Sequence, residues 1–189
     1  MTQRAEARAQ ESELIAAART GDVAAFEGLV LQHQERAFNV ALRLLGQRED
    51  AEDATQEAFV RAYRGLRGFG GQAQFGTWLT RIVINVCRTH GARRGRWPVS
   101  TEAELADPQA EESDPAEAAA REGVKATVHQ ALGELPRKFR EVLVLYELEG
   151  MSYEEVAAAL GRPVGTVRSR LNRARLALRD KLQGRIDLG

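Results

Sequence analysis

The chain has 189 residues, of which 43% are hydrophobic and 29% charged, so it can bury a core and is long enough for two small domains. It contains no run of about eighteen apolar residues, and its polar first residues, MTQRAEARAQESE, lack the apolar segment of a signal peptide. We therefore expect a cytoplasmic protein. The single cysteine, Cys87, excludes an internal disulfide and is expected to be a packing residue, and the three scattered histidines lack the spacing of metal ligands. We expect no metal and no other cofactor.

The formal net charge is zero, but the charges are segregated along the chain. Residues 49–57 contain five acids, and residues 58–97 then contain eight arginines and no acid. Residues 98–117 contain seven acids and no base, whereas residues 162–185 contain seven arginines and one lysine against one acid. Two basic blocks separated by an acidic segment indicate two places where the protein meets a phosphate backbone.

The first half of the chain has the periodicity of helices. Apolar residues recur at three- and four-residue steps and β-branched alternation is absent, so we predict an all-α protein. The first strong helix is expected at residues 24–45, with Gly46 as its C-terminal stop. A second helix is predicted at residues 49–66, where acids in the first turn suit the positive end of the helix dipole. Its regularly spaced alanines form a stripe that allows close helix packing.

The segment after the second predicted helix is rich in glycine but also carries large aromatic side chains. Residues 67–76, RGFGGQAQFG, contain four glycines and two phenylalanines. We predict a basic loop whose exposed aromatic rings are suited to stacking on a base. A third helix is expected at residues 77–93, where Arg81, Asn85 and Arg88 step along a face distinct from the apolar one. That polar face can meet a partner.

Proline and acidic residues mark a domain boundary in the middle of the chain. Three of the five prolines fall within residues 98–118, a segment of low hydrophobicity. We interpret it as a flexible acidic linker that joins a domain of residues 1–97 to a domain of residues 119–189. In the second domain we expect helices at residues 118–135, 136–149, 152–160 and 164–183.

The clearest local pattern lies in residues 152–182. Ser152 and Glu155 fit a capping box, and Gly161 closes a short helix. A turn and a long helix follow, and this helix carries one apolar and one basic face. A short helix, a tight turn and an amphipathic basic helix are typical of a DNA-binding helix-turn-helix. The pattern by itself fits a helical hairpin with a solvated basic face equally well.

The longer sequence context resembles a known family. The segment LPRKFREVLVLYELEGMSYEEVAAALGRPVGTVRSRLNRARLALR closely resembles region 4 of extracytoplasmic-function sigma factors. In the first half, DAEDATQEAFVRAY resembles the helix of region 2 that docks on RNA polymerase, and FGTWLTRIVINVCRTHGARR resembles the segment that melts and reads the −10 element. The two resemblances span residues 23–97 and 119–183. Within the family the chain is most similar to the envelope-stress and alginate-type branch.

The resemblance implies two small helical domains, a region 2 bundle and a region 4 helix-turn-helix. It also implies an alternative sigma factor that binds core RNA polymerase, recognises the −10 and −35 elements of promoter DNA and promotes DNA opening. Such a protein initiates transcription of a stress regulon and is controlled by an anti-sigma factor, often a membrane-anchored one. An enzyme is a third possibility, but the sequence contains no paired carboxylates in a glycine-bounded pocket, no phosphate loop and no nucleophile–base signature. We therefore expect no catalytic residue and no small-molecule substrate.

By resemblance, three groups of residues carry this function. The polymerase-binding group is Asp53, Gln56, Glu57, Phe59 and Tyr63. The −10 group is Phe69, Arg81, Ile82, Asn85 and Arg88. The −35 group is Thr166, Arg168, Ser169, Asn172, Arg173 and Arg175, of which Thr166 suits phosphate and Arg175 suits a backbone contact. Asn172 departs from the branch, in which this position is commonly aromatic, and asparagine favours bidentate contact with adenine.

Several of these residues also fit plainer roles. Phe59 and Tyr63 are equally suited to core packing, and Asn85 to an internal hydrogen bond. Phe75 and Trp78 are expected in the core. The acidic linker is interpreted as a tether, and the family adds passage through the polymerase active-site and RNA-exit channels. The competing function is a conventional helix-turn-helix regulator that binds an operator without polymerase.

Overall fold

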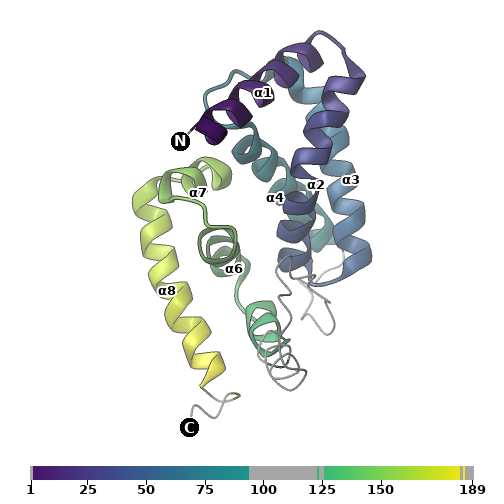
Figure 1. Cartoon of the computed structure of the whole chain (residues 1–189). Coiled ribbons are helices and arrows are strands. Elements are labelled where there is room, and N and C mark those ends of the chain that lie inside the picture. The colour runs from purple at the N-terminus through teal and green to yellow at the C-terminus, as the bar shows by residue number, and fades with distance from the viewer. Residues whose placement is uncertain (1, 94–122, 124–125, 184, 186–189) are drawn as a thin grey trace, which may run out of the picture.

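The computed structural model describes residues 2–93, 123, 126–183 and 185, with side chains from residue 6 onward. All regular elements in these ranges are helical, which confirms the predicted all-α fold (Figure 1). The predicted linker at 98–118 lies outside the described residues. The helices are α1 (Thr2–Arg19), α2 (Val23–Leu45), α3 (Arg48–Gly65), α4 (Phe75–Arg93), α6 (Arg137–Leu143), α7 (Tyr153–Leu160) and α8 (Val164–Leu182). There are also two short elements, η1 (Leu66–Gly68) and η2 (Val144–Leu148), and residues 126–133 are helical as well.

The first domain is a bundle in which α2 packs against α1, α3 and α4. The Asp22 side chain accepts a hydrogen bond from the Ala25 N–H and caps the start of α2. Gly46 ends α2 in the left-handed conformation, with φ of 75°, as predicted. The alanine stripe of α3 is fully buried, so this helix approaches its neighbours closely. Cys87 is also buried in this core, and burial raises the pKa of its thiol.

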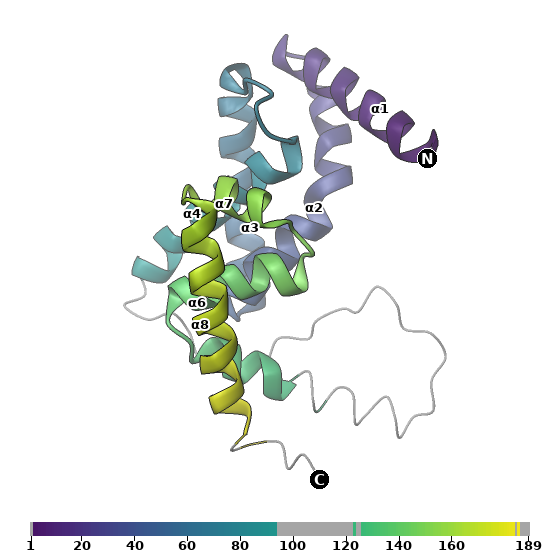
Figure 2. The same cartoon turned by 90° about the vertical axis from the view of Figure 1, so that its left-hand side faces the viewer.

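Helix α1 was not predicted from the sequence. It lies against the N-terminal part of α2 at one end of the first domain (Figure 2). Leu14 packs where α2 has a glycine: a Cβ on Gly28 would lie 3.2 Å from Leu14 Cδ2. His33 of α2 also lies 2.7 Å, Nε2 to Oε1, from the Glu11 carboxylate. Helix α1 is polar overall, so its own sequence shows no clear apolar face. Its few apolar side chains are held in place by these contacts with α2.

The prediction of exposed aromatic rings in the glycine-rich loop is wrong. Phe69 is 7% exposed and Phe75 only 1%. Together with Trp78 they form a cluster with ring centroids 5.0 to 5.9 Å apart. Burial of Phe75 also starts α4 two residues earlier than expected. The cluster confirms Phe75 as a core residue, because burial of large rings outweighs the loop tendency of the surrounding glycines.

The second domain comprises the helical residues 126–133 followed by α6, η2, α7 and α8. The predicted capping box of Ser152 and Glu155 is present at the start of α7. Gly161 ends α7 in the left-handed conformation, with φ of 63°. The helix predicted at residues 136–149 instead changes to a π-helical turn at η2, where the Glu149 N–H donates to the Val144 carbonyl. Helix α8 buries its apolar stripe against α6 and α7.

The two domains pack against each other, with α7 against α4 (Figure 1). The buried Arg140 of α6 donates from Nη1 to the Leu44 carbonyl of α2 over 2.9 Å. The Glu149 carboxylate, itself largely buried, pairs with Arg36 and Arg43 of α2. One cluster of buried hydrophobic residues extends through both domains, and these charged groups lie beside it. Each charge must lose water when the domains pack, so the charge pairs stabilise the contact only while both partners are present. The domain contact is therefore one that a change of charge can weaken.

Candidate nucleic-acid interface

Helix α8 presents the predicted −35 group to solvent along its outer face. Arg168, Ser169, Asn172 and Arg173 are exposed, and Thr166 is half-buried in the first turn. The Ser169 hydroxyl donates to the Thr166 carbonyl over 3.0 Å. Figure 1 shows α8 on the side of the second domain that faces away from α2 and α3. An exposed polar face on an otherwise packed helix is the arrangement that allows side chains to reach base edges in a major groove.

Arg175 differs from the rest of this group because the protein itself binds its guanidinium. Its Nε donates to Glu147 Oε1 over 2.7 Å, and its Nη2 lies 2.6 Å from the same oxygen. The guanidinium carbon also lies 5.6 Å from the centre of the Tyr146 ring. The hydrogen bond with Glu147 raises the pKa of Arg175. A DNA phosphate that binds Arg175 must therefore share its guanidinium with the Glu147 carboxylate.

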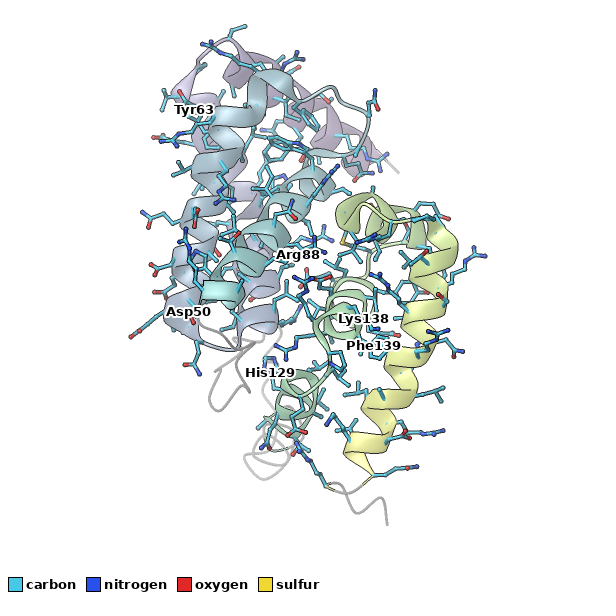
Figure 3. The ribbon with its side chains drawn as sticks, turned by 180° about the vertical axis from the view of Figure 1, so that it is seen from behind. Asp50, Tyr63, Arg88, His129, Lys138 and Phe139 are labelled. Carbon is cyan, nitrogen blue, oxygen red and sulfur yellow. The ribbon has the colours of Figure 1, made fainter. Side chains whose placement is uncertain are left out.

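The predicted −10 group lies on α4 and the preceding loop. Arg81 and Asn85 are exposed and Ile82 is half-buried. Arg88 points toward the second domain (Figure 3), where its Nε and Nη2 each donate to one oxygen of Glu141 over 2.9 Å. Its Nη1 donates to Asn85 Oδ1 over 3.1 Å. The hydrogen bond with Glu141 raises the pKa of Arg88. The Arg88 guanidinium, which is predicted to contact DNA, is thus already bound by a carboxylate of the second domain.

Phe69 lies within the aromatic cluster, with its ring 5.0 Å from that of Trp78. A base can stack on this ring only if the loop between η1 and α4 rearranges, because the ring is buried. Its role in binding an unpaired base therefore stays a prediction. The roles of the other −10 residues also stay predictions.

Three of the five predicted polymerase-binding residues line a groove between α2 and α3. The groove has a volume of about 980 Å³ and is largely apolar. Gln56, Phe59 and Tyr63 line it, whereas Asp53 is exposed on the same helix outside the lining. The Phe59 ring is buried, which confirms its packing role, while Tyr63 keeps 39% of its surface exposed. The remaining lining residues include Val30, Phe38 and Val60.

Glu57 does not line the groove. Its carboxylate lies 2.8 Å from His90 Nε2 of α4 and 2.5 Å from Arg61 Nη2 of its own helix. The hydrogen bond with His90 is the main reason that the pKa of Glu57 is lowered. Glu57 therefore connects α3 to α4, a role that the sequence did not indicate.

No group of three or more histidine, cysteine, aspartate or glutamate side chains in the described part of the chain is arranged to hold a metal ion. Among the helices that the structure describes, none combines the length and apolarity that crossing a membrane requires. Sequence reasoning missed Glu141, Glu149 and the stacked pair of Tyr146 and Tyr153. Only the two tyrosines had a signal in the sequence, because both are aromatic residues in the segment that leads to the predicted recognition helix.

Both domains match models of known protein families. The model for Sigma-70 region 2 matches residues 29–97, and the model for Sigma-70 region 4 matches residues 125–178. The RNA polymerase sigma-H factor of Pseudomonas aeruginosa is 40% identical over 182 residues, covering 92% of this chain and 94% of that protein. The ECF RNA polymerase sigma-E factor of Escherichia coli K12 is 36% identical over 178 residues, covering 90% and 93%.

Two solved structures have the same architecture. The structure of CnrH in complex with the cytosolic domain of CnrY superposes with a TM-score of 0.69 at 31% identity, covering 94% of this chain and 99% of that one. The sigma factor RpoE of Bartonella quintana, in complex with the anti-sigma factor NepR, gives a TM-score of 0.66 at 26% identity, covering 85% and 98%.

Proposed function

Because the chain belongs to the extracytoplasmic-function family of RNA polymerase sigma factors, we propose that it binds core RNA polymerase, recognises the −10 and −35 promoter elements and promotes DNA opening. It acts in the cytoplasm as an initiation factor rather than as a catalyst. The observation that carries this proposal is the combination, in one chain, of an apolar docking groove in the region 2 domain and an exposed polar face on α8 in the region 4 domain.

The groove between α2 and α3 is the surface that docks on polymerase. Val60 and Tyr63 are 45% and 39% exposed at its edge, and such large apolar side chains favour burial against a partner. Gln56 lies among them, and Asp53 adds a charge beside the groove. An apolar surface bordered by polar side chains suits a helical segment of the polymerase.

The exposed face of α8 reads the −35 element. Arg168, Asn172 and Arg173 offer the donors and acceptors that distinguish base pairs in the major groove. Binding both elements also requires the domains to separate. The two elements lie roughly 25 base pairs apart, which is about 85 Å of duplex, whereas α7 and α4 are in contact. Promoter binding therefore breaks the pair of Arg88 with Glu141.

The packed arrangement of the two domains suits the state held by an anti-sigma factor. The similar structures of CnrH and of the Bartonella RpoE are both complexes, with CnrY and NepR respectively. An anti-sigma factor that binds both domains of this chain keeps Arg88 paired within the protein. Release of that partner in response to stress then makes the chain available to polymerase.

In vitro transcription tests the proposed function. Purified chain and core polymerase are incubated with a promoter fragment selected by the holoenzyme from a random library. Specific initiation that requires the chain supports the proposal. Sequence-specific binding by the chain without polymerase, and no initiation with it, supports the helix-turn-helix regulator instead.

A matched pair of variants tests the docking groove. Val60→Glu places a charge at the edge of the groove and should abolish co-purification with core polymerase, because the carboxylate loses water on docking. Leu31→Glu changes an apolar residue of α2 that is 71% exposed and does not line the groove, and it should leave co-purification intact. Equal behaviour of the two variants would contradict the assignment.

A further inference from the structure

Four side chains from three elements form a continuous stack beside α8. The Tyr146 ring of η2 stacks on the Tyr153 ring of α7, with centroids 4.6 Å apart and planes inclined by 27°. The Arg168 guanidinium carbon lies 5.1 Å from the centre of the Tyr153 ring. Arg175 lies 5.6 Å from the centre of the Tyr146 ring at the other end. The order is arginine, tyrosine, tyrosine, arginine.

The spacing along α8 allows this stack. Arg168 and Arg175 are seven residues apart, which is close to two helical turns, so they project from the same face about 10 Å apart. The two tyrosine rings occupy the space between them. Tyr146 and Tyr153 also pack against the hydrophobic core, so the rings are held by the domain and do not depend on DNA.

The two ends of the stack differ in their hydrogen bonds. Arg175 is held in place by Glu147. The guanidinium of Arg168 contacts Tyr153, and no described residue accepts a hydrogen bond from it. A guanidinium that lies with its planar face over an aromatic ring keeps the N–H groups at its edge available to another partner. These N–H groups are what a bidentate contact with guanine O6 and N7 requires.

We propose that Tyr153, supported by Tyr146, is a positioning residue that orients Arg168 for contact with one base of the −35 element. This inference rests on the proposed function. A long arginine side chain loses rotamer freedom when it binds DNA, and a ring that already restrains it lowers that cost. The effect is confined to the base that Arg168 contacts.

A purely structural role for Tyr153 has a different consequence. A ring that only fills the core changes the stability of the domain, and its removal weakens binding to every DNA sequence alike. A ring that orients Arg168 changes the preference at one base position. Sequence preference, measured position by position, therefore separates the two roles.

The experiment uses holoenzyme assembled from the full chain and core polymerase. It selects promoter fragments whose −35 region is randomised, and sequencing of bound and unbound DNA gives the preference at each position. Arg168→Ala identifies the base that Arg168 reads, where a good bidentate contact discriminates by about tenfold. Tyr153→Leu should lose most of that preference at the same position and leave the other positions within about twofold. The salt dependence of binding should not change, because no charge is removed.

Three further variants test the proposal more strictly. Tyr153→Phe retains the ring and should retain the preference. Tyr153→Leu combined with Arg168→Ala should lose no more preference at that position than Arg168→Ala alone, because the two residues act as one unit. Phe139→Leu is the matched control: it removes another half-buried ring of the second domain, one that contacts Lys138, and should leave the preference intact.

One variant avoids any question of folding. Arg168 is exposed, and Arg168→Lys keeps its charge but removes the planar group that stacks and binds in bidentate fashion. This variant should lose the base preference as Arg168→Ala does. An unchanged preference in Arg168→Lys or in Tyr153→Leu, or an equal loss at all positions in Tyr153→Leu, overturns the positioning role alone. If the wild-type holoenzyme selects no sequence and initiates nowhere, the proposed function is contradicted as well.

Discussion

Replacing Glu141 by glutamine should weaken the contact between the two domains while leaving each domain folded. The Glu141 carboxylate is 2% exposed and accepts two hydrogen bonds of 2.9 Å from Arg88 of the first domain. Glutamine has nearly the same volume and keeps one acceptor, but it loses the charge. The packing of α6 therefore stays as it is, and the change is confined to the charge of residue 141, which pairs with Arg88 across the domain contact and with Arg137 of its own helix.

The size of the effect follows from the exposure of the two partners. A hydrogen bond to a charged group contributes roughly 1.5–3 kcal/mol, and the lower part of this range applies because Arg88 is 28% exposed and water can replace the lost partner. We expect the domain contact to weaken by about 1.5–2 kcal/mol, which is a factor of roughly 10–30 in the ratio of separated to packed chains.

The assay is a titration of core polymerase with labelled chain. When only a small fraction of the chain is in the state that binds polymerase, the apparent Kd is inversely proportional to that fraction. Glu141→Gln should therefore bind core polymerase more tightly than the wild type, by up to roughly 10–30-fold. Glu134→Gln is the matched control, because Glu134 pairs with Lys181 and Arg185 of its own domain. A Kd for Glu141→Gln within twofold of both wild type and this control would refute the reasoning.

The remaining predictions concern stability and can be checked by urea unfolding. Ser152→Ala removes the capping box of α7 and should lower the free energy of unfolding by about 1 kcal/mol, whereas Ser12→Ala on the exposed α1 should change it little. Leu29→Ala should cost about 3 kcal/mol because Leu29 is fully buried in the first domain, and a cost below 1 kcal/mol would contradict its placement. Burial, with the charges of Arg43 and Arg140, lowers the pKa of His129 below its ordinary 6.5. As the pH drops, the unfolded chain therefore binds a proton at His129 before the folded chain does. The free energy of unfolding should fall as the pH drops below 6.5. His129→Gln should reduce that fall, and an identical pH dependence in wild type and variant would count against it.

Much of the fold follows from patterns within a few residues of each other. Helices α2, α3, α7 and α8 begin and end within two residues of the predicted limits, because caps, glycines and the three- to four-residue apolar repeat act locally. The exposed face of α8 follows in the same way: once the apolar stripe is buried, the arginines between its members must face outward. The family resemblance then supplied the roles of these residues.

Local patterns failed where a residue is placed by a partner far along the chain. Phe69 was expected to be exposed because its neighbours are glycines, yet its ring is buried against Phe75 and Trp78. Helix α1 is polar, and its contacts with α2 are not visible in its own sequence. The pairing of Arg88 with Glu141 joins residues 53 positions apart.

The sequence by itself thus determined that the chain is helical, where its helices run and which face of α8 is polar. The tertiary structure alone decided which charges are paired between the domains and which rings support the arginines of α8. The physical reason is that helix formation depends on hydrogen bonds and side chains three or four residues apart, whereas ion pairs and ring stacks depend on how separate helices are packed.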